Sequence, residues 1–174
     1  MFDLERLLSH GFVSGRRLAL DIAGHALRAV DPRRAVLSRL SVEAGRLRID
    51  NDVYDLDHFE HIYIVGGGKA CYPQALAVEQ LLGDRITSGF ISVKKGQLVP
   101  FVERMGRLTR LRVSESAHPV PDETSLEAGR QILAIAEGAG ARDLVICLMS
   151  GGTSAQVIAP VSYTHLTLPT NREV

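Results

Sequence analysis

The sequence predicts an α/β fold: a doubly wound, mostly parallel, Rossmann-like sheet that is incomplete at its C-terminal end. Three observations predict it. Short apolar runs alternate with stretches of helical periodicity from residue 61 onward. The run Leu144–Met149 is apolar throughout, as expected for a strand covered on both faces of its sheet. Glycine-rich turns follow two of the strands, at Gly66–Gly68 and Gly151–Gly152. This rhythm is typical of parallel sheets with helical crossovers.

Composition sets the broad class of protein. The 174 residues are 45% hydrophobic and 23% charged, which suits one domain with a real core. The formal net charge is zero, so the overall charge indicates neither a nucleic-acid partner nor an anionic membrane. No apolar run approaches the ~20 residues that span a bilayer. The two cysteines lie far apart in apolar surroundings, so we expect packing residues and a reducing, cytoplasmic location, not a disulfide framework.

The first sixty residues predict two helices and a hairpin. One helix spans Ser14–Val30, because apolar side chains recur along one face of it. Asp31 and Pro32 end this helix and begin a second short one. The segment RLRIDNDVYDL predicts two short strands around Asp50–Asp52. Its charged faces indicate an addition at the edge of the fold, outside the core.

The remaining elements build the sheet. Helices are predicted from the glycine turn to Leu82 and over Asp122–Ala136, where Thr124 with Glu127 fits a capping box. A last helix begins within Thr153–Ala159, and nothing periodic follows it. Such a sheet has an open edge and uncovered apolar faces, so we expect marginal stability and self-association. The predicted strands are Ile62–Val65, Gly89–Val93, Leu111–Val113 and Leu144–Met149.

Polar and small residues follow each predicted strand. In an open parallel sheet, ligands bind beyond the carboxyl ends of the strands, where loop amides and helix N-termini point outward. Such a rim favours a phosphate or a carboxylate. The alternative to a ligand-binding role is a purely structural one, in which each glycine only allows a tight strand–helix turn to form. The residues at the four strand ends are Gly66, Gly67, Gly68 and Lys69; Lys94 and Lys95; Ser114, Glu115, Ser116 and His118; and Ser150, Gly151, Gly152 and Ser154.

The first glycine turn fails two motif tests. A P-loop requires glycine at position 63 and Ser or Thr at position 70, where this chain has Tyr63 and Ala70. The dinucleotide fingerprint meets Cys71 in place of its third glycine, and lysines stand where an acidic residue is expected after the next strand. An NADP-dependent oxidoreductase stays open as a weaker alternative.

Two side chains stand out as candidates for chemistry. Lys69 follows three glycines at a strand end, where a compact positive charge reaches a phosphoryl oxygen; the alternative is a solvated lysine. His118 lies in a loop stiffened by two prolines and either orients a substrate or bonds its own loop. His58 and His61 lack further ligands, so no metal site is predicted in this chain.

Three stretches, IYIVGGGKA, SESAHPVPDE and DLVICLMSGGTSA, occur in this order and together resemble the N-terminal domain of type II glycerate kinases. These are glycerate 2-kinases with a C-terminal MOFRL domain, and some members are called hydroxypyruvate reductase. The resemblance covers about residues 12–160. It implies transfer of the γ-phosphoryl group of ATP, with Mg²⁺, to the 2-hydroxyl of D-glycerate.

The resemblance also implies roles for individual residues. Lys69 corresponds to the lysine that is regarded as catalytic in the family. Binding of nucleotide or substrate is expected at Gly66, Gly67, Gly68, His118, Ser150, Gly151, Gly152 and Ser154. This chain departs from the family at Gln156, where members commonly have leucine.

Family members are more than twice as long, and their second domain supplies an arginine and acidic residues to the active site. We therefore expect residues 1–160 to be a truncated N-terminal domain that lacks its MOFRL partner and is inactive alone. Residues 161–174, VSYTHLTLPTNREV, resemble a translated sequencing adapter and are expected to be non-native. A homodimer is a further expectation. Two alternatives stay open: an NADP-dependent hydroxypyruvate reductase and a non-catalytic phosphate- or nucleotide-binding module.

Overall fold

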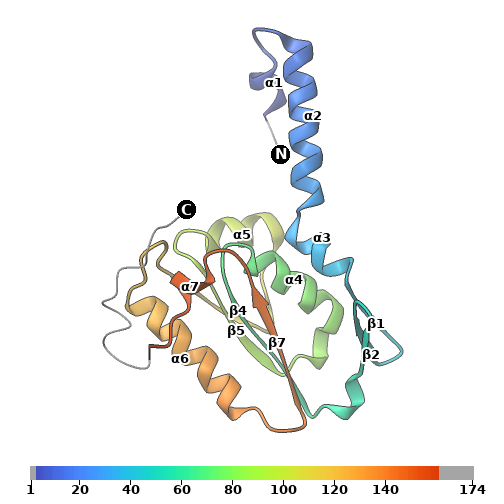
Figure 1. The fold of residues 1–174 in the computed structure, drawn as a ribbon, viewed down its shortest axis with the longest axis vertical. Coiled ribbons are helices and arrows are strands. Elements are labelled where there is room, and N and C mark those ends of the chain that lie inside the picture. The colour runs from blue at the N-terminus through green and yellow to red at the C-terminus, as the bar shows by residue number, and fades with distance from the viewer. Residues whose placement is uncertain (1–2, 161–174) are drawn as a thin grey trace.

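The computed structural model describes residues 3–160, and Figure 1 shows their arrangement. The predicted tail, residues 161–174, lies outside the described residues. A four-stranded sheet forms the body of the protein, and a three-stranded sheet lies beside it. No helix among residues 3–160 is long and apolar enough to cross a membrane.

The N-terminal part contains three helices followed by the small antiparallel sheet. The helices are α1 (Leu4–Leu7), α2 (Val13–Ala29) and α3 (Pro32–Leu37), and Asp31 caps α3 through a hydrogen bond from the Arg34 amide. The strands β1 (Leu40–Glu43), β2 (Arg46–Ile49) and β3 (Asp52–Asp55) pair in sequence order. Helices α2 and α3 and the hairpin of β2 and β3 agree with the sequence prediction, whereas α1 and β1 were not predicted.

The main sheet contains β4 (His61–Gly67), β5 (Ser88–Lys94), β6 (Arg112–Ser116) and β7 (Asp143–Met149). All neighbouring strands are parallel, and their order is β6-β5-β4-β7. Helices α4 (Cys71–Leu82) and α6 (Glu123–Gly138) cover opposite faces, with α5 (Leu98–Met105) between β5 and β6 in the chain and α7 (Thr153–Gln156) after β7. The α/β prediction is confirmed.

Strand order decides where the candidate residues meet. The two strands that end in glycine turns, β4 and β7, are direct neighbours, with Gly67 opposite Met149 in register. Since both strands run in the same direction, their turns emerge side by side at one rim. The sequence predicted a common rim but contained no signal for this adjacency, because the two strands are separated by about eighty residues of chain.

The core joins the main sheet to α4 and to the small sheet. Leu47 of β2 has 0% exposed surface and belongs to the same buried cluster as Leu56, Ile64 and Val78. The prediction that the hairpin lies outside the core was therefore wrong. Arginines flank Leu47 on both sides, so the alternation of β2 shows one buried face of a strand.

Helix α2 projects away from the body, and its apolar side stays uncovered by residues 3–160 (Figure 1). Ile22, Leu27 and Val30 have 62%, 59% and 71% of their surface exposed. The amphipathic period predicted the helix correctly, but the helix contributes no residue to the buried core.

Three local predictions were wrong. The capping box of α6 pairs Asp122 with Ser125, not Thr124 with Glu127. The third strand begins at Arg112 and includes Ser114, Glu115 and Ser116, which were predicted to follow it. The apolar run of β7 is mostly half-buried, with Cys147 and Met149 exposed, so it is not covered on both faces, and β7 is also an edge strand of the sheet.

Candidate functional site

The two glycine turns contact each other through their backbones. The Lys69 amide donates to the Gly151 carbonyl at 3.0 Å, and the Ser150 amide donates to the Gly67 carbonyl at 3.2 Å. The Thr153 hydroxyl also donates to the Gly67 carbonyl, at 2.7 Å, and the Ala70 amide donates to Ser150 Oγ at 3.0 Å. These bonds join segments eighty residues apart in the chain into one unit.

Gly68 allows this close approach. Its φ is +113°, and a Cβ atom there would lie 2.2 Å from Ser150 Oγ and 2.6 Å from the Ser150 carbonyl oxygen. Only glycine adopts such a backbone without strain, and only glycine leaves room for Ser150. A Cβ on Gly66 would similarly lie 2.3 Å from the Leu148 carbonyl oxygen. The structure thus gives these glycines a packing role, and contact with a ligand stays a prediction.

The two turns differ in the amides that they leave available. In the first turn, the amides of Lys69, Ala70 and Cys71 all donate to acceptors within the protein. In the second turn, the amides of Gly151, Gly152 and Ser154 have no acceptor among residues 3–160. Unpaired amides attract anions. The second turn is therefore the better anion-binding backbone, although the first was the sharper motif in the sequence.

Lys69 and His118 lie beside this backbone. Lys69 is exposed, and its ammonium group forms no ion pair with a described residue, so its charge is available to a ligand. The half-buried His118 ring packs against Gly152: its Nε2 atom lies 3.1 Å from where a Cβ on that glycine would be. The peptide bond to Pro119 is cis. The structure thus brings together three of the segments that the sequence predicted to share a rim.

Gln156 also lies at this rim, although the sequence indicated it only as a departure from the family pattern. It has 0% exposed surface, and its Oε1 atom accepts a hydrogen bond from the Gly68 amide at 3.1 Å. No pattern in the sequence indicated this contact, because a glutamine after a short polar turn predicts a solvated side chain.

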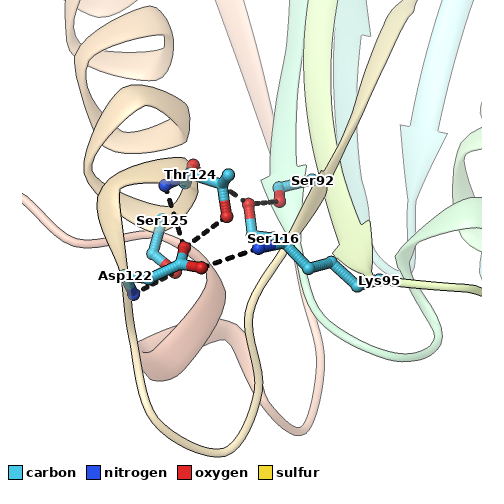
Figure 2. Close-up of polar contacts among 6 residues, drawn as sticks. All are labelled: Ser92, Lys95, Ser116, Asp122, Thr124 and Ser125. Carbon is cyan, nitrogen blue, oxygen red and sulfur yellow. Dashed lines mark hydrogen bonds and ion pairs between the residues drawn. The ribbon is translucent and has the colours of Figure 1, made fainter.

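Two of the other rim residues, Lys95 and Ser116, contact the start of α6 (Figure 2). The hydroxyls of Ser92 and Ser116 are buried and lie 2.6 Å apart. Lys95 Nζ donates to Asp122 Oδ2 at 2.6 Å, and Asp122 also caps α6 by accepting from the Thr124 amide at 2.9 Å. The hydrogen bonds from Lys95 and Thr124 lower the pKa of Asp122 from 3.8 to about 2.

This lowered pKa predicts an acid-sensitive contribution to stability. A carboxylate whose pKa is lower in the folded than in the unfolded chain stabilises the fold above the unfolded value. The contribution of Asp122 is therefore complete above about pH 4 and is lost as the pH falls toward about 2. We expect Asp122→Ala to lower the urea midpoint at pH 7 and to approach the wild-type midpoint below pH 3. Asp122→Asn, which retains the cap without the ion pair, separates the two effects. An equal difference from wild type at both pH values would contradict this assignment.

The described residues offer no vacant set of metal ligands at this rim. Asp122 is occupied as above, and a Glu115 carboxylate oxygen accepts from the Leu98 amide at 2.9 Å. At the opposite rim, ligand atoms of Glu60, His61 and Asp143 lie within 4.8 Å of one another. Those groups are already paired: His61 Nδ1 lies 2.8 Å from Asp143 Oδ1, and Glu60 forms an ion pair with Arg142. Hydrogen bonds from the Gly140 amide and from His61 lower the pKa of Asp143.

Comparison with known proteins identifies the family. The profile described as "Domain of unknown function (DUF4147)" matches residues 18–173. The glycerate 2-kinase of Pyrococcus horikoshii is 31% identical over 159 residues, which are 90% of this chain and 34% of that protein. Human glycerate kinase is 36% identical over 146 residues, 78% of this chain and 27% of that protein. A protein of Agrobacterium vitis that carries the name of a hydroxypyruvate reductase is 34% identical over 155 residues, 89% of this chain and 31% of that protein.

Solved structures agree with this assignment. The crystal structure of glycerate kinase from Thermotoga maritima has a TM-score of 0.61 and 27% identity, and the match covers 83% of this chain and 30% of that one. This chain spans about a third of the length of the relatives that it matches. It belongs to the DUF4147 family, the N-terminal domain of type II glycerate kinases.

Proposed function

We propose that these residues form the N-terminal part of a glycerate 2-kinase, which transfers the γ-phosphoryl group of ATP to the 2-hydroxyl of D-glycerate. One observation carries the proposal: Lys69 lies together with the amides of Gly151, Gly152 and Ser154, which have no acceptor among residues 3–160, at the ends of adjacent parallel strands. Relatives named glycerate kinase support the choice of substrate.

The chemistry of the rim suits phosphoryl transfer. In such reactions the protein mainly positions the reactants and offsets negative charge on the transferred group. The amides of Gly151, Gly152 and Ser154 hold phosphate oxygens in this proposal, and the Lys69 ammonium contacts the transferred phosphoryl group. His118 orients the hydroxy acid. Gly67 and Gly68 fix the position of Lys69 through their backbone contacts to Ser150, and Gly66 does so through its close approach to Leu148.

Magnesium does not fit the described residues. Mg²⁺ is usually held by carboxylates together with substrate phosphates. The Asp122 and Glu115 carboxylates near this rim are committed to protein hydrogen bonds. In the proposed enzyme, the protein ligands of Mg²⁺ therefore come from outside residues 3–160, and we derive no step through the metal.

We further propose that residues 1–160 are one domain of a longer protein, completed by a MOFRL domain, and that residues 161–174 are non-native. The relatives are about three times as long as this chain, which supports the first part. A homodimer also stays a proposal. In the proposed homodimer, a second copy of the chain covers the exposed apolar side of α2 around Ile22 and Leu27. Light scattering of the purified chain tests this, and a monomer at high concentration would rule it out.

The 174-residue chain provides a direct test of the incomplete site. We expect negligible formation of phosphoglycerate from ATP, Mg²⁺ and D-glycerate, because the described residues supply neither metal ligands nor a second wall around the phosphates. A coupled assay for ADP with mass spectrometry of the product measures this. Turnover above the no-enzyme control, abolished by Lys69→Ala, would show that this chain alone completes the active site.

A reductase is the second candidate, since one relative carries that name. Dinucleotide-binding folds hold the pyrophosphate on the amides at the start of the helix after the first glycine turn. Here the amides of Lys69, Ala70 and Cys71 already donate within the protein. This occupancy argues against NADP at that turn. A titration with NADPH distinguishes the candidates: saturable binding at micromolar cofactor favours the reductase.

A further inference from the structure

Gln156 contacts both glycine turns: its side chain bonds Gly68 in the first turn, and its backbone amide donates to the Gly152 carbonyl in the second. Its side chain is fully buried, and its Oε1 atom accepts from the Gly68 amide at 3.1 Å, an N–H that it shares with the Ser92 carbonyl at 3.2 Å. A backbone N–H can only donate, so this bond fixes which end of the Gln156 amide is oxygen and which is nitrogen. The NH₂ group therefore points away from Gly68.

The NH₂ group of Gln156 has no acceptor among the described residues, although it is buried. A buried donor without an acceptor is costly, so natural structures rarely retain one. One acceptor lies near it. A Cβ atom on Gly152 would be 3.2 Å from Gln156 Nε2 and 3.1 Å from His118 Nε2, so both nitrogen atoms border the same space beside this glycine.

We propose that Gln156 is a positioning residue that acts through His118 and Gly68 at the same time. Its oxygen accepts from the Gly68 amide, and its NH₂ donates to His118 Nε2 once the two side chains rotate toward each other. A neutral imidazole that accepts at Nε2 carries its proton on Nδ1. The ring is thereby fixed as an Nδ1–H donor.

The same arrangement explains why residue 152 is glycine. Its φ is +99°, and a Cβ atom there would lie 3.0 Å from His118 Cδ2 and 3.2 Å from Gln156 Nε2, tighter than ordinary contact with either side chain. If the proposed function holds, the His118 Nδ1–H is the donor available to the carboxylate of the hydroxy acid. The proposal itself concerns only the apo chain, so its test is independent of kinase activity.

The tautomer of His118 tests the proposal. Long-range ¹H–¹⁵N correlation spectra of the uniformly labelled 174-residue chain at pH 8 report which ring nitrogen is protonated, and His118→Asn assigns the signals. We expect the Nδ1–H form to predominate in the wild type. Gln156→Leu is expected to lose this preference, and Gln156→Glu to invert it, because the introduced carboxylate accepts from Nε2–H.

Gln131→Leu is the matched control, since Gln131 lies on α6 and bonds Arg112 and Glu127. It is expected to leave the His118 tautomer unchanged. A predominant Nε2–H form in the wild type, which needs no variant to fold, would overturn the proposal. So would an unchanged tautomer in both Gln156 variants.

Discussion

Replacing Lys69 by alanine in the longer protein is expected to lower kcat by about 10²- to 10³-fold, the range typical of removing one group that stabilises transition-state charge. Lys69 is exposed at the end of β4 and forms no ion pair with a described residue. Its removal therefore leaves the fold unperturbed and takes away only the positive charge offered to the phosphoryl group. Steady-state kinetics with D-glycerate and ATP measure the effect.

Two variants control this experiment. Lys69→Arg retains the charge but not the compact ammonium geometry, so we expect an intermediate kcat. Arg48→Ala removes an exposed cation from the small sheet, remote from the rim, and is expected to behave as wild type. A wild-type kcat in Lys69→Ala would remove this residue from the mechanism. An equal loss in Arg48→Ala would show that overall charge, and not position, is responsible.

Gly68→Ala is expected to destabilise the fold by roughly 2 to 5 kcal/mol, combining backbone strain with overpacking. The added Cβ would lie 2.2 Å from Ser150 Oγ and 2.6 Å from its carbonyl oxygen. The backbone of Ser150 is itself bonded to Gly67, so it cannot withdraw without breaking the contact between the turns. Urea unfolding followed by circular dichroism measures the loss.

Gly96→Ala is the matched control for the contact. Gly96 has a similar φ of +82°, but a Cβ there would meet nothing within 4 Å. We expect only the cost of the backbone conformation, about 1 to 2 kcal/mol. If the two variants are equally stable, the close approach of the glycine turns is not as tight as the structure shows.

The periodic parts of the chain were predictable because local patterns determine them. The apolar period identified α2, and the strand ends placed Lys69, Ser150 and His118 at one rim. Strand order is different: the pairing of β4 with β7 depends on packing between distant segments, which no local period records. Without that pairing, the direct contact of the two glycine turns was not predictable.

Burial was predicted less well than the elements. The arginines around Leu47 concealed a buried face, and the apolar run of β7 indicated full burial although the strand lies at the edge of the sheet. Gln156 is the most instructive case. Burial of a polar side chain is costly unless it forms a hydrogen bond. The hydrogen-bond partner of the Gln156 side chain is the Gly68 amide, which is 88 residues away along the chain.

The most direct measurement of the central claim is the product that the longer protein forms from D-glycerate and γ-labelled ATP. The account predicts label transfer to 2-phosphoglycerate, lost in Lys69→Ala and retained in Arg48→Ala. Absence of a labelled product, together with oxidation of NADPH by hydroxypyruvate under the same conditions, would contradict the account and favour the reductase.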